Sequence, residues 1–222
     1  MRSLTADDAT TVSRIRDAAV LLFGRSGYDA TSVRAIAAEA KVSAGLVIHH
    51  FGTKEALRLA CDEHIVAEVM SPGGADASGT TGAPETTLAD GVQRWIDNLD
   101  VHRPALDYLA RMLTDRPSLA DGLFDALVDR TEAMIAEGAA AGVMHRGSDP
   151  RMTAVIVAAQ GLMPLLLERH IGRAIGEAGL SVAAIRRMTL PSVELYTHGL
   201  YATTALLDAT RAGLASGEGT HS

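Results

Sequence analysis

The side chains best suited to chemistry lie in the N-terminal quarter of the chain, where positive charge is concentrated. Residues 11–58 contain seven Lys and Arg against four Asp and Glu, a net charge of +3, whereas the whole chain of 222 residues carries −7. Guanidinium and ammonium groups neutralise phosphate, so a basic segment on an acidic body is typical of a protein that binds nucleic acid through one part only. A chance distribution of charge over a solvated helical surface would give the same asymmetry.

Pairs of histidine and cysteine side chains are candidates for metal binding. His49 and His50 are adjacent, and Cys61 and His64 lie three residues apart, but neither pair has a second ligand cluster at a suitable spacing. For Cys61 the alternative is a small buried hydrophobic side chain. The chain contains no P-loop, nucleophile elbow, dinucleotide-binding glycine pattern or metalloprotease helix. The sequence therefore predicts a protein that is not an enzyme and that uses no metal or cofactor.

Helical periodicity indicates the elements that would position the basic residues. From Thr11 to Gly27 the apolar residues recur at steps of three and four, which predicts an amphipathic helix closed by Gly27. Three more helices are each preceded by a hydroxyl side chain that can cap the first turn. One follows Thr31 or Ser32 and ends near residue 40, one follows Ser43 and spans 44 to about 50, and one follows Thr53.

The second and third of these helices are short and joined by a tight turn, with the first helix bracing them. That arrangement is a helix-turn-helix, whose second helix fits the major groove of B-DNA. The segments that carry it are TSVRAIA at 31–37, VSAG at 42–45 and HFGTKEAL at 50–57. With Phe23 and the Gly27-Tyr28 bend, residues 11–60 resemble the TetR/AcrR family of bacterial repressors in order and spacing.

The resemblance implies a role in DNA contact for three polar side chains. Arg34 matches a position from which family members reach a base edge, and its guanidinium can address guanine O6 and N7. Ser32 is expected to bind a phosphate beside the exposed amides of the helix start. Lys54 matches the lysine that clamps a phosphate at the start of the fourth helix. A solvated Lys54, and an Arg34 that contacts only phosphate or solvent, are the alternatives.

The recognition helix departs from the family pattern. Its groove-facing positions are Ala44, Gly45 and Leu46, which offer no side-chain hydrogen bond. Ile48 and His49 stand where the family usually has a Tyr-Tyr or Tyr-Trp pair, so a tyrosine hydroxyl is lost while His49 can still donate to a phosphate. Specificity is expected to depend largely on Arg34 and DNA shape. The expected DNA-binding set is Ser32, Arg34, Ser43, Ala44, Gly45, Leu46, Ile48, His49, His50 and Lys54.

The rest of the chain is also predicted to be helical. Residues 71–86 are rich in Gly, Pro, Ser and Thr, which predicts a flexible loop. No stretch alternates as a strand would, and none reaches the roughly 20 apolar residues of a membrane span. We expect an all-α fold with a DNA-binding domain at 1–52 and a ligand-binding and dimerisation domain at 53–222. The expected helices of this body are 88–99, 105–113, 119 to about 141, 150 to about 173, and 192–211, with 180–191 left ambiguous.

The resemblance further implies a homodimer that binds a palindromic DNA operator and is released by a small effector. The helices at 150–173 and 192–211 carry more apolar surface than one subunit readily hides, and in this family the last two long helices pair with their copies. An apolar or amphipathic effector is expected to shift the fourth helix and so change the separation of the two heads. The candidate pocket residues, each of which could instead be ordinary core, are Trp95, Tyr108, Met112, Phe124, Met134, Gln160 and Met163.

The composition also bears on the compartment and on the rival function. With a single cysteine and a polar N-terminus, the chain is expected to be cytoplasmic. The apolar recognition helix leaves a second hypothesis open, namely a helical module that binds protein or ligand and carries a degenerate DNA-binding head. Salt separates the two, because phosphate neutralisation makes affinity fall steeply as salt rises.

Overall fold

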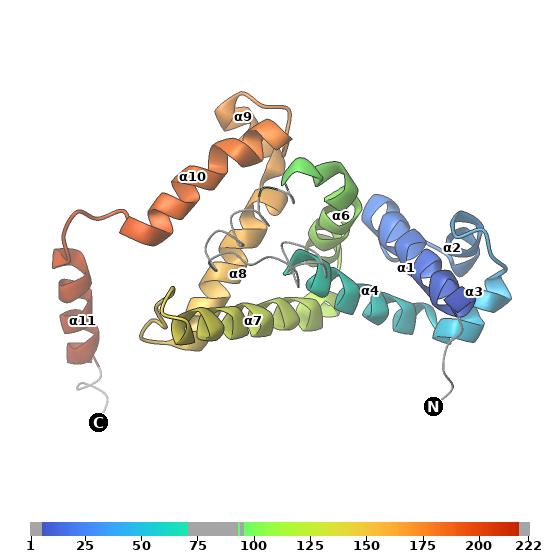
Figure 1. Ribbon diagram of the computed structural model, residues 1–222, viewed down its shortest axis with the longest axis horizontal. Coiled ribbons are helices and arrows are strands. Elements are labelled where there is room, and N and C mark those ends of the chain that lie inside the picture. Colours follow the sequence, from blue (N-terminus) through green and yellow to red (C-terminus); the bar gives the residue numbers. More distant parts are fainter. Residues whose placement is uncertain (1–5, 71–92, 94–95, 218–222) are drawn as a thin grey trace. The chain divides into compact units, whose positions relative to one another are not determined.

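The computed structural model describes residues 6–70, 93 and 96–217, and every regular element in these ranges is an α-helix (Figure 1). The predicted all-α fold is therefore confirmed, while the predicted loop at 71–86 lies outside the described residues. The helices are α1 (Ala6–Ser26), α2 (Val33–Glu39), α3 (Ala44–Phe51), α4 (Lys54–Val69), α6 (Leu99–Asp115), α7 (Pro117–Ala140), α8 (Pro150–Leu166), α9 (Glu168–Ile175), α10 (Val182–His198) and α11 (Ala205–Gly217).

The chain forms two compact units, Met1–Val182 and Ala183–Ser222. The first unit contains α1 to α9, and the second contains α11 and nearly all of α10. The expected domain boundary after residue 52 falls inside the first unit, between α3 and α4. Helices on the two sides of this boundary pack together, as α1 does against α4 and α6. The boundary itself remains a prediction.

Ser43 and Thr53 cap their helices as predicted, and of the two candidates for α2 it is Ser32, not Thr31, that caps the helix. The Ser32 hydroxyl accepts a hydrogen bond from the Ala35 amide at 3.1 Å, and the same arrangement recurs at Ser43 and at Thr53, at the starts of α3 and α4. Each hydroxyl satisfies an amide that has no partner within its own helix. The caps fix where α2, α3 and α4 begin, and so place their first turns at the surface.

The turn between α2 and α3 depends on one strained residue. Lys41 adopts a left-handed conformation with φ of 55°, which is unusual for a side chain with a Cβ. The Lys41 amide donates to the Ala38 carbonyl and the Val42 amide to the Ala37 carbonyl, at 3.1 and 2.9 Å. These two bonds form a Schellman motif, which ends α2 and turns the chain sharply into α3.

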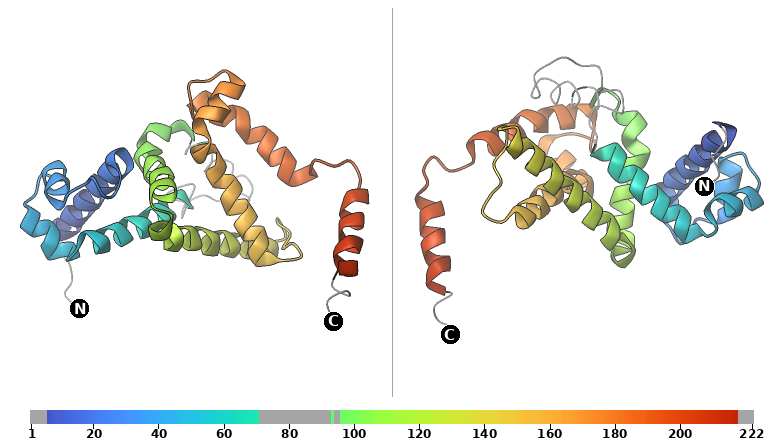
Figure 2. Two further views of the ribbon diagram at one scale, coloured as in Figure 1. Left: turned by 180° about the vertical axis from the view of Figure 1, so that it is seen from behind. Right: turned by 60° about the horizontal axis from the view of Figure 1, so that its bottom comes forward.

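One hydrophobic core joins the first three helices to the body. The same cluster of buried residues contains Phe23 and Val47 from the head and Tyr108 and Met112 from α6. The Phe23 and Tyr108 rings lie 6.3 Å apart. Figure 2 shows α4 running from α3 towards α6 and α7, which it also contacts. The head is therefore packed against α4 and α6, and a displacement of either helix would also shift residues of the head.

The predicted continuous helix at 150–173 is wrong. α8 ends at Leu166, and α9 begins at Glu168 with its axis bent by 72°. Pro164 lacks an amide and its ring crowds the preceding turn, which weakens the helix just before the break. The Arg103 guanidinium then holds Glu168 through two bonds of 3.0 Å from α6. Among the described helices, no single one has the length and apolar character needed to cross a membrane.

The other predicted helix limits also need correction. Instead of one helix at 192–211, α10 begins at Val182, passes through Pro191 and ends at His198. Gly199 then takes a left-handed conformation with φ of 71°, a usual way for a helix to end. α6 begins at Leu99 and runs through Pro104, so the helix expected at 105–113 starts six residues earlier than predicted. Most of the helix expected at 88–99 lies outside the described residues. Pro191 and Pro104 therefore lie inside helices. A proline in a helix interior costs about 3 kcal/mol of stability, which the other interactions of each helix offset.

The contact between α1 and α6 provides a test of this packing. A Cβ on Gly24 would lie 2.9 Å from the Tyr108 amide nitrogen and 3.2 Å from the Asp107 carbonyl carbon, both of them backbone atoms. We expect Gly24→Ala to lower the free energy of unfolding by about 1–3 kcal/mol, because α1 and α6 must separate. Urea denaturation followed by circular dichroism measures the change.

Gly122 in α7 is the matched control. A Cβ there meets no atom within 4 Å, so Gly122→Ala should raise the free energy of unfolding by about 0.5–1 kcal/mol through helix propensity. Equal effects of the two substitutions would contradict a close contact between α1 and α6.

Candidate DNA interface

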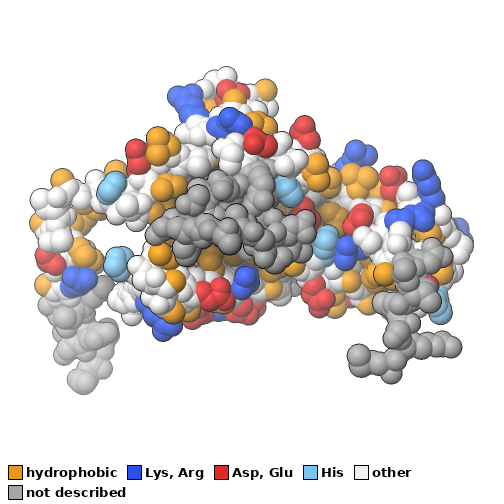
Figure 3. All heavy atoms as spheres, viewed as in Figure 1, with side chains coloured by type: hydrophobic (Ala, Val, Ile, Leu, Met, Phe, Trp, Pro, Cys, Tyr) orange, Lys and Arg blue, Asp and Glu red, His pale blue; other side chains and the backbone are white. Residues whose placement is uncertain are grey.

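The first turn of α2 presents two of the predicted DNA-binding side chains to solvent. Arg34 is exposed and makes no hydrogen bond or ion pair with another described residue. Ser32, also exposed, caps the helix and keeps its hydroxyl hydrogen available for an acceptor. Figure 3 shows several Lys and Arg side chains over the part of the molecule that contains α1–α3. This end of α2 can therefore receive an anion without breaking an internal contact.

The recognition helix α3 exposes a short surface of mixed character. Gly45, Ile48 and His49 are exposed, with 47% of Ile48 accessible, while Val47 is buried in the core. Among the other predicted contacts, Ser43 is exposed, and Ala44 and Leu46 are half-buried. Ser43, Gly45, Ile48 and His49 therefore lie on the open side of α3, whereas Ala44 packs partly against the core.

His50 shares its half-burial with Ala44 and Leu46, but it carries a polar ring atom into the head. It is half-buried, and its Nε2 atom has no hydrogen-bond partner among the described residues. Its ring lies 5.3 Å from that of His49 in an edge-to-face arrangement. His50 is therefore held partly inside the head, and its role in binding DNA remains a prediction.

Lys54 is placed at the start of α4, as expected, but it is already engaged. Its Nζ donates to the Tyr28 carbonyl at 2.6 Å and lies 4.1 Å from the centroid of the Tyr28 ring. Burial lowers the pKa of the ammonium below its usual value. An ammonium has three donors, so a phosphate could share it, but its first role in the free protein is to fix Tyr28 against α4.

A buried polar network that sequence reasoning missed begins at Arg58 in α4. Only 4% of Arg58 and 7% of Asp62 are exposed, and their side chains are hydrogen-bonded to each other. The same guanidinium donates to Glu55 Oε1 at 2.6 Å and to the Leu119 carbonyl in α7 at 3.1 Å. The spacings of three and four residues in α4 suggest such pairs, but nothing in the sequence indicates that Arg58 and Asp62 are buried, whereas Glu55 is exposed.

The network ends in a tyrosine on each side. The Tyr108 hydroxyl donates to Asp62 Oδ1 at 2.6 Å, and the Tyr28 hydroxyl donates to Glu55 Oε2 at 2.9 Å. Burial raises the pKa of Asp62, although the bonds from Tyr108 and Arg58 act in the opposite direction. Burial and the bond to Glu55 raise the pKa of Tyr28 to about 12. Both phenols are therefore donors at neutral pH.

The predicted effector-binding residues are not gathered around one cavity. Tyr108 and Met112 are fully buried in the main core, and Phe124 packs against that core. Met134 packs against a second, smaller cluster between α7 and α8. Gln160 is half-buried, Met163 is 46% exposed, and Trp95 lies outside the described residues. Their assignment to an effector site remains a prediction.

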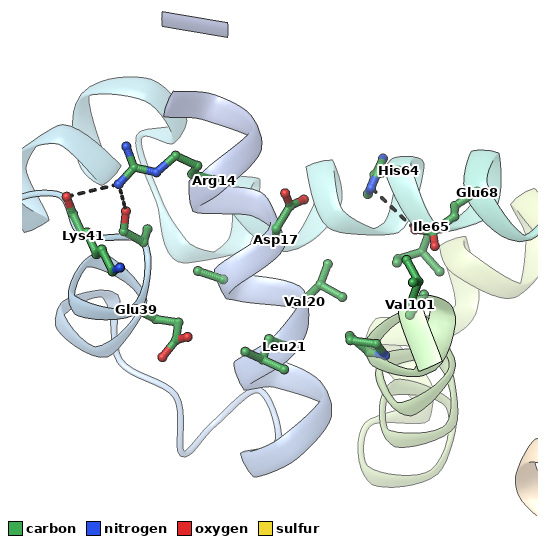
Figure 4. A pocket seen from close by; sticks show the side chains of 14 residues that line it. Arg14, Asp17, Val20, Leu21, Glu39, Lys41, His64, Ile65, Glu68 and Val101 are labelled. Carbon is green, nitrogen blue, oxygen red and sulfur yellow. Dashed lines mark hydrogen bonds and ion pairs between the residues drawn. The ribbon is translucent and has the colours of Figure 1, made fainter. Parts of the chain in front are cut away.

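A cavity of about 580 Å³ lies instead beside the head, and none of the predicted effector residues lines it. Its walls come from α1, from the end of α2, from α4 and from α6. Figure 4 shows Val20 and Leu21 of α1 on one side and Ile65 and Val101 on the other. On the α4 side, Glu68 Oε1 lies 2.8 Å from His102 Nδ1. Among the described residues, no group of three or more His, Cys, Asp or Glu is arranged to hold a metal ion.

Comparison with known proteins identifies the family. A model described as bacterial regulatory proteins of the tetR family matches residues 8–61, and one described as the tetracyclin repressor-like C-terminal domain matches residues 100–202. The HTH-type transcriptional regulatory protein RaaS of Mycobacterium tuberculosis is 37% identical over 213 residues, which cover 95% of this chain and 96% of that protein. An HTH-type transcriptional repressor of the same organism is 42% identical over 64 residues, which cover 29% of this chain and 34% of that protein.

Solved structures agree with the fold. The transcriptional regulator FadR from Bacillus subtilis, in complex with stearoyl-CoA, matches with a TM-score of 0.60 and 16% identity, over 85% of this chain and 99% of that one. FadR from Bacillus halodurans, a fatty acid degradation regulator, has a TM-score of 0.62 and 17% identity, over 85% of this chain and 99% of that one. With both family domains present and a relative aligned over nearly its whole length, the chain belongs to the TetR family of bacterial transcriptional regulators.

Proposed function

We propose that this regulator acts in the bacterial cytoplasm as a homodimeric repressor that binds a palindromic operator and is released by a small apolar or amphipathic effector. It acts by binding, without catalysis. The observation that supports DNA binding most strongly is the open first turn of α2, where Arg34 and Ser32 are exposed and Arg34 is not engaged by another described residue. An arginine without an internal partner, on a capped helix start next to the recognition helix, is suited to a base edge or a phosphate.

Arg34 and Lys54 are expected to contribute to DNA affinity in different ways. With the intergenic DNA upstream of its own gene, Arg34→Ala should weaken binding by about 1–3 kcal/mol, roughly 5- to 150-fold, by removing a base contact. Lys54→Ala should weaken binding to all sequences and reduce the salt dependence by about one phosphate contact. Mobility shifts at several salt concentrations between 50 and 200 mM, a range over which phosphate contacts weaken strongly, measure both effects.

Arg130 provides the matched control for this experiment. It is exposed on α7, with only a 3.7 Å ion pair to Glu137, so Arg130→Ala should leave the affinity unchanged. Thermal melts of each variant separate a loss of folding from a loss of contact. If the wild-type protein fails to bind this DNA at any salt concentration, the account is wrong and a protein-binding module with a degenerate head takes its place.

The dimer is supported by an apolar stripe on α8. Met152, Ile156, Met163 and Leu166 are all exposed, and with exposed Ala159 their spacing of three and four residues places them on one face of the helix. Ala154 and Leu162 are buried and pack against the body. A helix that buries one apolar face and exposes another needs a partner, and a second α8 provides a self-complementary one.

Ile156 tests this dimer. Its side chain is 58% exposed, so Ile156→Glu should leave the fold intact but place two buried carboxylates at the symmetric interface. The protein should sediment at the monomer mass of 23.2 kDa, in place of about twice that value. Val101→Glu, at a 71% exposed position on α6, is the control and should stay dimeric. A monomeric wild-type protein, or an unaffected Ile156→Glu dimer, would exclude α8 as the interface.

The effector is proposed to bind among the apolar side chains of α6, α7 and α8, where Met112, Phe124, Met134 and Met163 are adaptable. Because Met112 and Met134 belong to separate clusters and share no cavity among the described residues, the effector would have to open a site between them. Tyr108, Gln160 and Trp95 complete the candidate set. Of the fold neighbours, FadR from Bacillus subtilis was solved with stearoyl-CoA. That ligand is amphipathic and is therefore a reasonable first probe for this chain.

Stearoyl-CoA is expected to weaken operator binding by roughly 5- to 150-fold, the range of ordinary allosteric coupling. Free coenzyme A carries the same charge without the acyl chain and should have no effect. A fluorescence-anisotropy titration of labelled operator in the presence of each compound measures the difference. Equal release by both compounds would show that anionic competition at the DNA surface, and not an apolar effector site, is responsible.

A further inference from the structure

The polar network in α4 connects two places that the proposed function must link. At one end, Tyr108 belongs to α6, which forms part of the body. At the other end, Tyr28 lies directly under Lys54, at the DNA-facing start of α4. Between them the hydrogen bonds are continuous through Asp62, Arg58 and Glu55. The path therefore runs from the body to the head entirely through side-chain hydrogen bonds.

The chemistry of this path differs from that of the surrounding core. A buried ion pair such as Arg58–Asp62 contributes little net stability, because desolvation offsets the attraction. Removing one of its partners is nevertheless costly, since a charge is then left unpaired. A hydrogen bond weakens steeply once its geometry is lost, so withdrawal of one partner leaves the next group in the network to find another. A change at one end of the network can therefore be passed on to the other.

Tyr108 is placed to control the network. It is fully buried, its ring lies 6.3 Å from that of Phe23, and its backbone nitrogen would lie 2.9 Å from a Cβ placed on Gly24 of α1. Asp62 accepts from Tyr108 through Oδ1 and from Arg58 through Oδ2. If α6 moved and the Tyr108 hydroxyl withdrew, Asp62 would depend on Arg58 alone. The guanidinium would then be drawn away from Glu55, which orients Tyr28.

We propose that the Tyr108–Asp62 hydrogen bond is a coupling contact, which transmits the position of α6 through Arg58 and Glu55 to the Lys54–Tyr28 contact at the DNA interface. Tyr108 is a positioning residue in this scheme and does not touch DNA. The proposal rests on the proposed function, since it describes how that function is regulated. Coupling free energies are reciprocal, so in this scheme DNA bound at the head also biases α6 and, through the Arg58 bond to the Leu119 carbonyl, α7.

Tyr108→Phe tests the coupling without requiring the effector to be known. Phenylalanine keeps the ring and its packing and removes only the hydroxyl. Hydrogen exchange is measured for the full-length protein with and without the upstream DNA. In the wild type, DNA should slow exchange in peptides of α2 and α3 and also in peptides of α6 and α7. In Tyr108→Phe the change in α2 and α3 should persist, while the change in α6 and α7 should fall at least threefold.

Two further variants make the outcome decisive. Tyr28→Phe cuts the other end of the path, at a half-buried position where loss of folding is not expected, and should also uncouple α6 and α7 from DNA. Tyr196→Phe, at an exposed position on α10, should behave as the wild type. The coupling would be overturned if DNA slowed hydrogen exchange in α6 and α7 of both Tyr108→Phe and Tyr28→Phe as much as in the wild type. It would also be overturned if DNA left exchange in α6 and α7 of the wild type unchanged. DNA binding at α2 and α3 would stand in either case. A wild type that does not bind DNA would instead refute the proposed function itself.

Discussion

The buried guanidinium of Arg58 is the constraint around which the head and the body are arranged. It must be paired with acceptors, because an unpaired charge at this depth would cost several kcal/mol. Glu55 and Asp62 of α4 and the Leu119 carbonyl of α7 supply them. α4 is therefore tied to the start of α7 by one charged group, and both carboxylates are fixed in orientation for the tyrosines that they bind.

The DNA-facing surface depends on this arrangement for its rigidity. The Tyr28 hydroxyl donates a hydrogen bond to Glu55. The Lys54 ammonium lies over the Tyr28 ring and donates to the Tyr28 carbonyl group. The apolar core continues from the head into α6 and α7, so the head has no independent core on which it could rotate freely. In contrast, the first turn of α2 is free of such ties. The chain thus combines a fixed platform with exposed side chains that can adapt to a DNA surface.

Local signals predicted the head well. Ser32, Ser43 and Thr53 cap their helices as expected, because a cap depends only on residues three positions away. The ends of the body helices were predicted poorly. The helix expected to begin at residue 192 begins at Val182 and runs through Pro191, whereas the break after Leu166 was not foreseen. The link from Asp62 to Tyr108 was inaccessible to sequence reasoning, because these two residues are 46 positions apart and no periodicity connects them.

The central claim is that two copies of this head read one operator. The most direct measurement is a hydroxyl-radical footprint of the full-length protein on the DNA upstream of its own gene. The account predicts two protected half-sites related by a two-fold axis, with centres separated by one helical turn of about 34–36 Å or a multiple of it. A single unsymmetrical protected patch, or protection that spreads evenly along the DNA, would contradict it.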